Sequence, residues 1–159
     1  MKALATFAGV ARRFERKGER NGVLVVDDYA HHPTEVAATL GAARQAYPER
    51  RLVVLFQPHL YTRTRDQADG FGAALLAADA VYVLPVYPSR EAPIPGVTSR
   101  LVSDAARSRG HRNVVDVEVR SEVVALLGKT LRPGDLLVTM GAGDVNRLGE
   151  EFLAEGGAA

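Results

Sequence analysis

Short apolar runs rich in β-branched residues recur along the chain and predict buried strands. They span residues 23–26, 52–56, 80–84, 114–117 and 136–140. Several of these runs are almost continuously apolar, which is typical of strands that are covered on both faces of a sheet. Strands of this kind belong to parallel sheets rather than to half-exposed antiparallel ones.

Segments with helical spacing of apolar residues separate these runs. They span residues 34–47, 67–77, 99–108, 121–131 and 145–154, and the first of them carries Val36, Leu40 and Ala43 on one face. Ser121 is a candidate N-cap of its segment, and Gly110 lies where a C-cap is expected. Alternating strands and helices predict an α/β fold of three layers, Rossmann-like, with helices on both faces of the sheet.

The first part of the chain departs from this alternation. Residues 11–16 alternate as a strand does, and residues 17–22 (K-G-E-R-N-G) are rich in turn formers. We therefore expect an N-terminal hairpin that adds one antiparallel strand, giving about six strands in a single domain over residues 1–159.

Composition narrows the class of protein. Hydrophobic residues make up 47% of the 159 residues and charged residues 25%, as in soluble globular proteins. A net charge of +1 gives no reason to expect a nucleic acid or a membrane as partner. The chain has no cysteine, no apolar run long enough to cross a membrane, and no small-residue cleavage site after its opening residues, so we expect a cytoplasmic protein without a signal peptide.

The loops that follow the predicted strands hold most of the candidate chemistry. They read D-D-Y-A-H-H-P at 27–33, Q-P-H-L-Y-T-R-T-R at 57–65, P-V-Y-P-S-R-E-A-P-I-P-G-V-T at 85–98 and G-A-G-D at 141–144, and they contain three of the four histidines. Ligands of open parallel sheets bind at the carboxyl ends of the strands. The clustering therefore predicts a polar binding site at that edge.

Each loop taken alone leaves alternatives open. His31 and His32 are adjacent and point in different directions, so we expect no shared metal site, and one of them packs or caps while the other is exposed. Asp27 and Asp28 are either turn or capping residues or carboxylates that take a ribose hydroxyl pair.

The arginines of the second loop also allow two interpretations. Arg63 and Arg65 are either solvated residues at a helix start or ligands for a phosphate or carboxylate. Cations at the positive end of a helix are unfavourable without an anion, which favours the second interpretation.

Two glycine patterns resemble phosphate-binding motifs without completing them. G-K-T at 128–130 lacks the first glycine of a P-loop, where Val123 stands, and G-A-G at 141–143 has Asn146 in place of the third glycine of a dinucleotide fingerprint. No complete nucleotide-binding motif is therefore present.

Taken together, the loops resemble one family. D-D-Y-A-H-H-P-T-E-V, F-Q-P-H-L-Y-T-R-T, R-E-A-P-I-P-G-V-T and T-M-G-A-G-D-V are similar to the C-terminal domain of the Mur ligases. The H-H-P form together with Q-P-H-x-Y-T-R-T resembles the branch that joins L-alanine to UDP-N-acetylmuramate. The likeness runs from F-A-G-V-A-R-R-F to the last predicted helix.

The resemblance implies an ATP-dependent, ADP-forming ligase of peptidoglycan precursor synthesis. ATP phosphorylates the muramate carboxylate, and the amine of alanine then attacks the acyl phosphate. In this family an N-terminal domain holds the UDP-sugar, a central domain holds ATP and Mg²⁺, and the C-terminal domain closes over both. Residues 1–12 would be the remnant of the interdomain hinge, the two other domains would lie outside this chain, and the fragment alone would be inactive.

The resemblance also assigns roles to individual residues. Asp28 would contact the ATP ribose, and Arg12 or Arg13 would contact the terminal phosphates. Tyr29, His31 and Arg63 would line the pocket where alanine meets the acyl phosphate, with His31 and Arg63 as the catalytic residues. In a departure from the pattern, Leu60 stands where some members carry a further arginine, so the carboxylate of alanine would depend on Arg63 or on Arg65.

Two other classes of function compete with a ligase domain. The first is a stand-alone nucleotide-binding or regulatory α/β module, and the second is an interaction domain whose polar edge docks a protein. The missing P-loop argues against a self-sufficient ATP-using protein.

Overall fold

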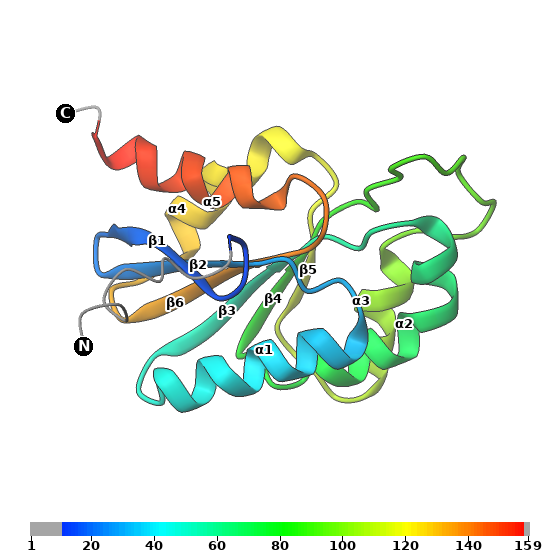
Figure 1. The fold of residues 1–159 in the computed structure, drawn as a ribbon, viewed down its shortest axis with the longest axis horizontal. Helices are drawn as coiled ribbons and strands as arrows, with labels where there is room; N and C mark the ends of the chain where they lie inside the picture. Colours follow the sequence, from blue (N-terminus) through cyan, green and yellow to red (C-terminus); the bar gives the residue numbers. More distant parts are fainter. Residues whose placement is uncertain (1–10, 158–159) are drawn as a thin grey trace, which may run out of the picture.

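The computed structural model describes residues 11–157, in which a six-stranded sheet lies between two layers of helices (Figure 1). The strands stand in the order β1-β2-β6-β3-β4-β5. Their bounds are Glu15–Arg20 (β1), Val23–Asp28 (β2), Arg51–Phe56 (β3), Ala80–Val83 (β4), Val114–Asp116 (β5) and Asp135–Met140 (β6). Only β1 runs antiparallel to its neighbour, which confirms the predicted fold class.

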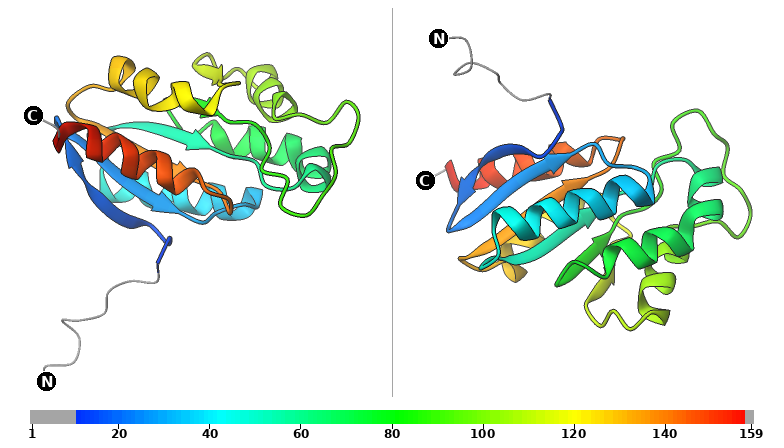
Figure 2. Two further views of the ribbon diagram at one scale, coloured as in Figure 1. Left: turned by 90° about the horizontal axis from the view of Figure 1, so that it is seen from above. Right: turned by 60° about the horizontal axis from the view of Figure 1, so that its bottom comes forward.

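The helices are divided between the two faces of the sheet (Figure 2). Their bounds are Pro33–Ala46 (α1), Tyr61–Leu75 (α2), Arg100–Ser108 (α3), Val123–Thr130 (α4) and Val145–Ala154 (α5), with 3-10 turns at Arg120–Glu122 and Glu155–Gly157. Helices α1, α2 and α3 pack on one face, and α4 and α5 cover the other. All residues of β2 and β6 are buried, because these strands are covered from both sides.

The two cores follow from the alternation of side chains along each strand. In β2, Leu24 and Val26 belong to the core beneath α1 and α2, while Val23 and Val25 belong to the core beneath α4 and α5. Successive side chains of a strand point to opposite faces, so an apolar run fills both cores at once. The continuous apolar runs in the sequence are therefore the cause of the three-layer architecture.

The predicted hairpin exists, but its bounds were wrong. Strand β1 spans Glu15–Arg20 rather than 11–16, and the turn lies at Asn21 and Gly22, with φ of 50° and 77°. An Asn-Gly pair is the usual choice for a turn that needs two positive φ values. The residues K-G-E-R, which were interpreted as part of the turn, form the strand itself, where the register shifts between Arg16 and Gly18. Because a bulge can hold a glycine within a strand, the sequence of such a strand resembles that of a turn.

Some predicted helix ends also differ from the structure. Helix α2 begins at Tyr61 instead of residue 67, and α4 begins at Val123 after a 3-10 turn. Ser121 lies in that turn and does not cap α4, whose N-cap is Glu122. Gly110 follows α3 with φ of 96°, as expected for a residue that ends a helix.

Two expectations concern the opening of the chain and its hydropathy. Residues 1–10 lie outside the described residues. They carry most of the predicted hinge and the opening segment for which no signal peptide is expected. Within the described part, no helix is both long and apolar enough to cross a membrane.

Two glycines in helices give a matched pair for testing the packing of the helical layer. A Cβ on Gly72 would lie 2.7 Å from backbone atoms of Ala105 and Ala106 in α3, whereas a Cβ on Gly41 in α1 meets nothing within 4 Å. We expect Gly72→Ala to lower the free energy of unfolding by about 1–3 kcal/mol, because α2 and α3 must move apart. Gly41→Ala should raise it by up to about 1 kcal/mol. Urea unfolding of both variants checks this, and equal stabilities would contradict the close helix contact.

Candidate functional site

The loops after β2, β3 and β6 share one edge of the sheet. The parallel register places Asp28 beside Met140 and Met140 beside Phe56. The backbone continues this pairing beyond the strands, since the N–H of Gly141 donates to Asp28 O at 3.2 Å and the N–H of Gln57 donates to Met140 O at 3.0 Å. The predicted clustering of these loops at the carboxyl edge is therefore present.

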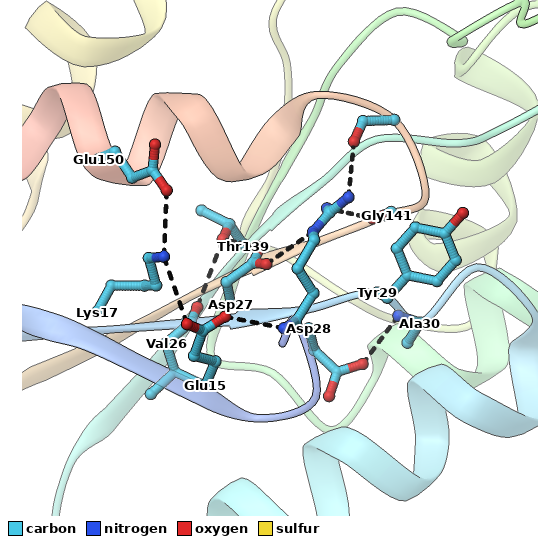
Figure 3. A network of polar contacts seen from close by, with 12 residues as sticks. Glu15, Lys17, Val26, Asp27, Asp28, Tyr29, Ala30, Thr139, Gly141 and Glu150 are labelled. Atoms are coloured by element: carbon cyan, nitrogen blue, oxygen red, sulfur yellow. Dashed lines mark hydrogen bonds and ion pairs between the residues drawn. The ribbon is translucent and has the colours of Figure 1, made fainter. Parts of the chain in front are cut away.

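A buried ion pair lies at the centre of this edge (Figure 3). The Asp27 side chain is 1% exposed and accepts hydrogen bonds from Thr139 Oγ1 at 2.6 Å and from Arg12 Nε at 2.9 Å. The rest of the Arg12 guanidinium donates to the carbonyl oxygens of Gly143 at 2.9 Å and Gly141 at 2.7 Å. It also lies 5.0 Å from the centre of the Tyr29 ring, in a cation–π contact. Arg12 is thus committed to contacts within the domain.

Asp28 holds the segment before β1 against the start of the loop after β2. One carboxylate oxygen accepts the backbone N–H of Ala30 and the other accepts that of Phe14, both at 2.8 Å. The start of α1 is capped by His32 and Glu35 in a capping box, so Asp28 acts as a turn residue rather than a helix cap. Each of its oxygens accepts one protein hydrogen bond, which leaves lone pairs for a ligand.

An open groove of about 370 Å³ lies between Asp28 and the first turns of α1. Arg13, Phe14 and Tyr29 line it together with Asp28, and the small side chains of Ala38 and Ala42 form part of its wall. Among the described residues, Arg13 has no ion-pair partner and is exposed. The groove therefore combines one free cation, the carboxylates of Asp28 and Glu35, and apolar surface.

Four aromatic rings form a line across three loops. Ring centres are 5.2 Å apart between Tyr29 and His31, 6.2 Å between His31 and His59, and 5.7 Å between His59 and Tyr87. The last pair is stacked, and the first two pairs meet edge to face. The loops after β2, β3 and β4 are therefore held in register by side-chain contacts.

The two histidines of this line present different atoms to the site. Nδ1 of His31 lies 2.9 Å from the carbonyl oxygen of Tyr29. Because a carbonyl oxygen only accepts, Nδ1 carries the proton and Nε2 of the neutral ring is a lone-pair acceptor. Nδ1 of His59 accepts from Arg63 Nη1 at 3.2 Å. Burial lowers the pKa of His59, and the nearby Arg63 guanidinium lowers it further, which favours the neutral ring.

Helix α2 begins at a strained residue and is capped from another loop. Leu60 has φ of 72°, a conformation that is unfavourable for a leucine, and its N–H donates to Tyr87 O at 2.9 Å. The carboxylate of Glu91 accepts from the backbone N–H of Thr62 at 3.0 Å and from the Thr62 hydroxyl. These hydrogen bonds lower the pKa of Glu91. A carboxylate of the protein thus occupies the helix end for which the sequence suggested an external anion.

The residues predicted from the sequence fall into separate places. Tyr29, His31 and Arg63 belong to one cluster that is joined through His59, while Asp28 and Arg13 border the groove, which Tyr29 also lines. Arg65 is exposed and pairs with Asp66 at 2.7 Å, outside these contacts.

Three residues of this edge were not singled out from the sequence. They are Gln57, His59 and Tyr87. A Cβ on Gly143 would lie 2.6 Å from the Tyr87 ring and 2.7 Å from Gln57 Oε1, so only glycine allows this approach. Their positions in the Q-P-H and P-V-Y loops were the available signal. Within residues 11–157, no group of three or more His, Asp or Glu side chains is arranged to hold a metal ion.

The neighbouring residues Arg12 and Arg13 make a direct test of the buried ion pair. Arg12→Ala leaves the Asp27 carboxylate buried with Thr139 as its remaining side-chain partner, so we expect a loss of about 2–3 kcal/mol in the free energy of unfolding. Arg13→Ala removes the same charge from an exposed side chain and should change stability by less than about 0.5 kcal/mol. Chemical denaturation measures both. Equal effects of the two variants would rule out the structural role of Arg12.

The titration of His59 tests the contact with Arg63. We expect its pKa to lie below the ordinary value of 6.5 and to rise in Arg63→Ala, without a full return because burial remains. As the pH falls below the ordinary value, the unfolded chain takes up this proton first. The contribution of His59 to stability is therefore present above pH 6.5 and is lost as the pH falls through its lower folded pKa. NMR titration of the ring nitrogens provides the measurement. Arg65→Ala is the matched control, and an unshifted His59 in the parent chain would contradict the geometry.

Comparison with known proteins places this chain in a family. Residues 12–143 match the family described as "Mur ligase, glutamate ligase domain". The chain is 52% identical over 153 residues to the UDP-N-acetylmuramate–L-alanine ligase of Desulfosudis oleivorans, covering 96% of this chain and 34% of that protein. It is 51% identical to the ligase of the same name from Streptomyces avermitilis, covering 95% and 32%. The chain thus spans about a third of the length of the curated relatives it matches.

Solved structures agree with this assignment. The UDP-N-acetylmuramate–alanine ligase of Thermotoga maritima superposes with a TM-score of 0.77 at 28% identity, over 94% of this chain and 30% of that one. A separately crystallised domain of a ligase from Haemophilus ducreyi gives a TM-score of 0.67 at 24% identity, over 90% of this chain and 98% of that one, and shows that the same fold exists as an isolated chain. The family match extends over well over half of the chain, and the chain therefore belongs to the Mur ligase family.

Proposed function

We propose that this chain is the closing domain of an ATP-dependent ligase that joins L-alanine to UDP-N-acetylmuramate in peptidoglycan precursor synthesis. The observation that carries the proposal is the cluster of Tyr29, His31, His59 and Arg63 at the carboxyl edge of the sheet. It combines an imidazole acceptor with a guanidinium, and it occurs in a chain whose relatives bear that ligase name. The complete enzyme needs parts that lie outside this chain.

Arg63 is suited to bind the anionic groups of the reaction. Its Nη1 is used by His59, and among the described residues no partner is found for its other guanidinium nitrogens. These N–H groups can donate to the carboxylate of alanine or to the oxygens of the acyl phosphate. Fixed cationic donors lower the barrier most where negative charge develops, as it does on the acyl oxygen of the tetrahedral intermediate when the amine attacks.

His31 is placed to accept the proton that the attacking amine loses. Alanine must lose a proton before its nitrogen forms the amide bond, and inorganic phosphate leaves from the acyl carbon. With Nδ1 held by Tyr29 O, the Nε2 of His31 is the free acceptor that can take this proton. Glu35 lies 3.5 Å from the same Nδ1 and would stabilise the protonated ring.

The groove beside Asp28 suits the nucleoside part of ATP. The unused lone pairs of the Asp28 carboxylate can accept the ribose hydroxyls, as carboxylates do in other nucleotide folds. Arg13, rather than Arg12, is the cation available for the phosphates, because the guanidinium of Arg12 is used within the domain. ATP supplies the phosphoryl group that activates the muramate carboxylate.

Mg²⁺ does not fit the described part of this chain, where no cluster of ligands is found. It therefore belongs with the remainder of the ligase, and no step here depends on it. The partners of the complete protein are ATP, UDP-N-acetylmuramate, L-alanine and its own other two domains, in the cytoplasm. Since Arg12 is fixed to β2 and β6, it moves with this domain when the enzyme closes.

Two arginines of α2 provide the test in the full-length ligase. We expect Arg63→Ala to lower kcat/KM for alanine by about 10²–10³-fold, the usual loss for one donor that stabilises developing charge. Arg65→Ala removes the same charge from the same helix and should stay within about threefold of the parent, because Arg65 pairs with Asp66. Alanine-dependent ADP release is the measurement. A parent-like rate in Arg63→Ala, with an unchanged unfolding midpoint, would refute the assignment.

A further inference from the structure

A second polar cavity lies at the opposite edge of the sheet, where the strands begin. It has a volume of about 520 Å³ and is lined by Arg51 at the start of β3, by Arg112 before β5, by Lys129 near the end of α4 and by Arg132 before β6. Tyr82 of β4 also borders it, and no acidic residue does. The proposed ligase site uses the other edge and none of these side chains.

The cavity has a rigid base. Arg51 is fixed by the buried Asp135, with Nε donating to Oδ1 at 2.9 Å and Nη2 to Oδ2 at 2.7 Å. The same carboxylate accepts the backbone N–H of Arg132 at 2.8 Å. The Nη1 of Arg51 has no partner among residues 11–157. One carboxylate therefore orders two of the basic residues and leaves a guanidinium nitrogen free to bind.

The distribution of unpaired cations points to an anion at this place. Nineteen of the twenty Lys and Arg residues are described, and twelve of them form ion pairs with Asp or Glu. The seven described cations that form none are Arg13, Arg63, Arg90, Arg112, Lys129, Arg132 and Arg147. Two of these belong to the proposed ligase site, and three line this single cavity. The Asp135 carboxylate pairs with Arg51 and leaves an excess of positive charge at the cavity, so the cluster favours an anionic ligand.

We propose that this cavity binds a small molecule carrying two or more phosphate groups. Guanidinium forks bind phosphate oxygens through paired hydrogen bonds, and a lysine adds a point charge. The volume lies in the range of small-ligand pockets. A net charge of +1 and the many paired arginines elsewhere argue against the extended basic surface that a nucleic acid or a membrane needs.

Inorganic pyrophosphate without Mg²⁺ is a suitable probe, because it has neither ribose nor base for the groove beside Asp28. Isothermal titration into the 159-residue chain at about 0.15 M salt should show saturable binding at one site. Arg112→Ala/Lys129→Ala should weaken the affinity at least tenfold. Arg90→Ala/Arg147→Ala removes the same number of unpaired charges and should leave the affinity within about twofold, because neither side chain lines the cavity.

Several outcomes would overturn the proposal. The first is an absence of saturable pyrophosphate binding, and the second is an equal loss of affinity in the control variant Arg90→Ala/Arg147→Ala. The third is a loss of binding in Arg13→Ala/Arg63→Ala, which would place pyrophosphate in the ligase site. Tighter binding of vesicles containing phosphatidylserine or of single-stranded RNA through Arg112 and Lys129 would replace the small ligand by a macromolecule. Equal unfolding midpoints show that a variant is folded, and Arg132→Ala repeats the test at a third position.

Discussion

The buried carboxylate of Asp27 is the constraint on which the candidate site depends. A carboxylate that is 1% exposed needs hydrogen-bond donors and a counter-charge, and Thr139 and Arg12 supply them here. Arg12 has a backbone φ of 59°, and its Nε donates to the Asp27 carboxylate. Its other guanidinium nitrogens donate to two carbonyl groups of the turn after β6. The pair thereby joins the segment before β1, the end of β2 and the turn after β6.

The same arginine connects this pair to the surface residues of the site. Its guanidinium lies over Tyr29, the first ring of the line that runs through His31 and His59 to Tyr87. Tyr87 in turn packs against Gly143, whose carbonyl accepts from Arg12. The contacts close into a ring through four loops. Such an arrangement keeps the catalytic candidates in fixed relative positions.

Much of the fold could be predicted because its causes are local. Continuous apolar runs give strands that are covered on both faces, and polar loops at their carboxyl ends give the position of the site. The bounds of β1 could not be predicted in the same way, because the glycine that signals a turn lies in a bulge. The choice between Arg12 and Arg13 was also beyond local reasoning. This choice depends on the carbonyl groups of Gly141 and Gly143, which lie about 130 residues away in the chain. In the same way, the start of α2 is capped by Glu91, which lies in a distant loop.

The net charge of the chain does not reveal where its unpaired charges gather. A net charge of +1 predicts that no strong field surrounds the whole molecule. However, most cations are neutralised by neighbours, and those that are not are concentrated at the two ends of the parallel strands. At the carboxyl end, unpaired arginines face loops that already carry aromatic rings and a carboxylate, so the site there is composite. At the amino end, the unpaired cations line a cavity that has no acidic residue in its lining, while Lys129 also borders a second cavity lined by Asp116, Glu118 and Glu122. The binding proposed there would be governed by charge. The two anion sites proposed for this sheet would therefore differ in the physical origin of their recognition.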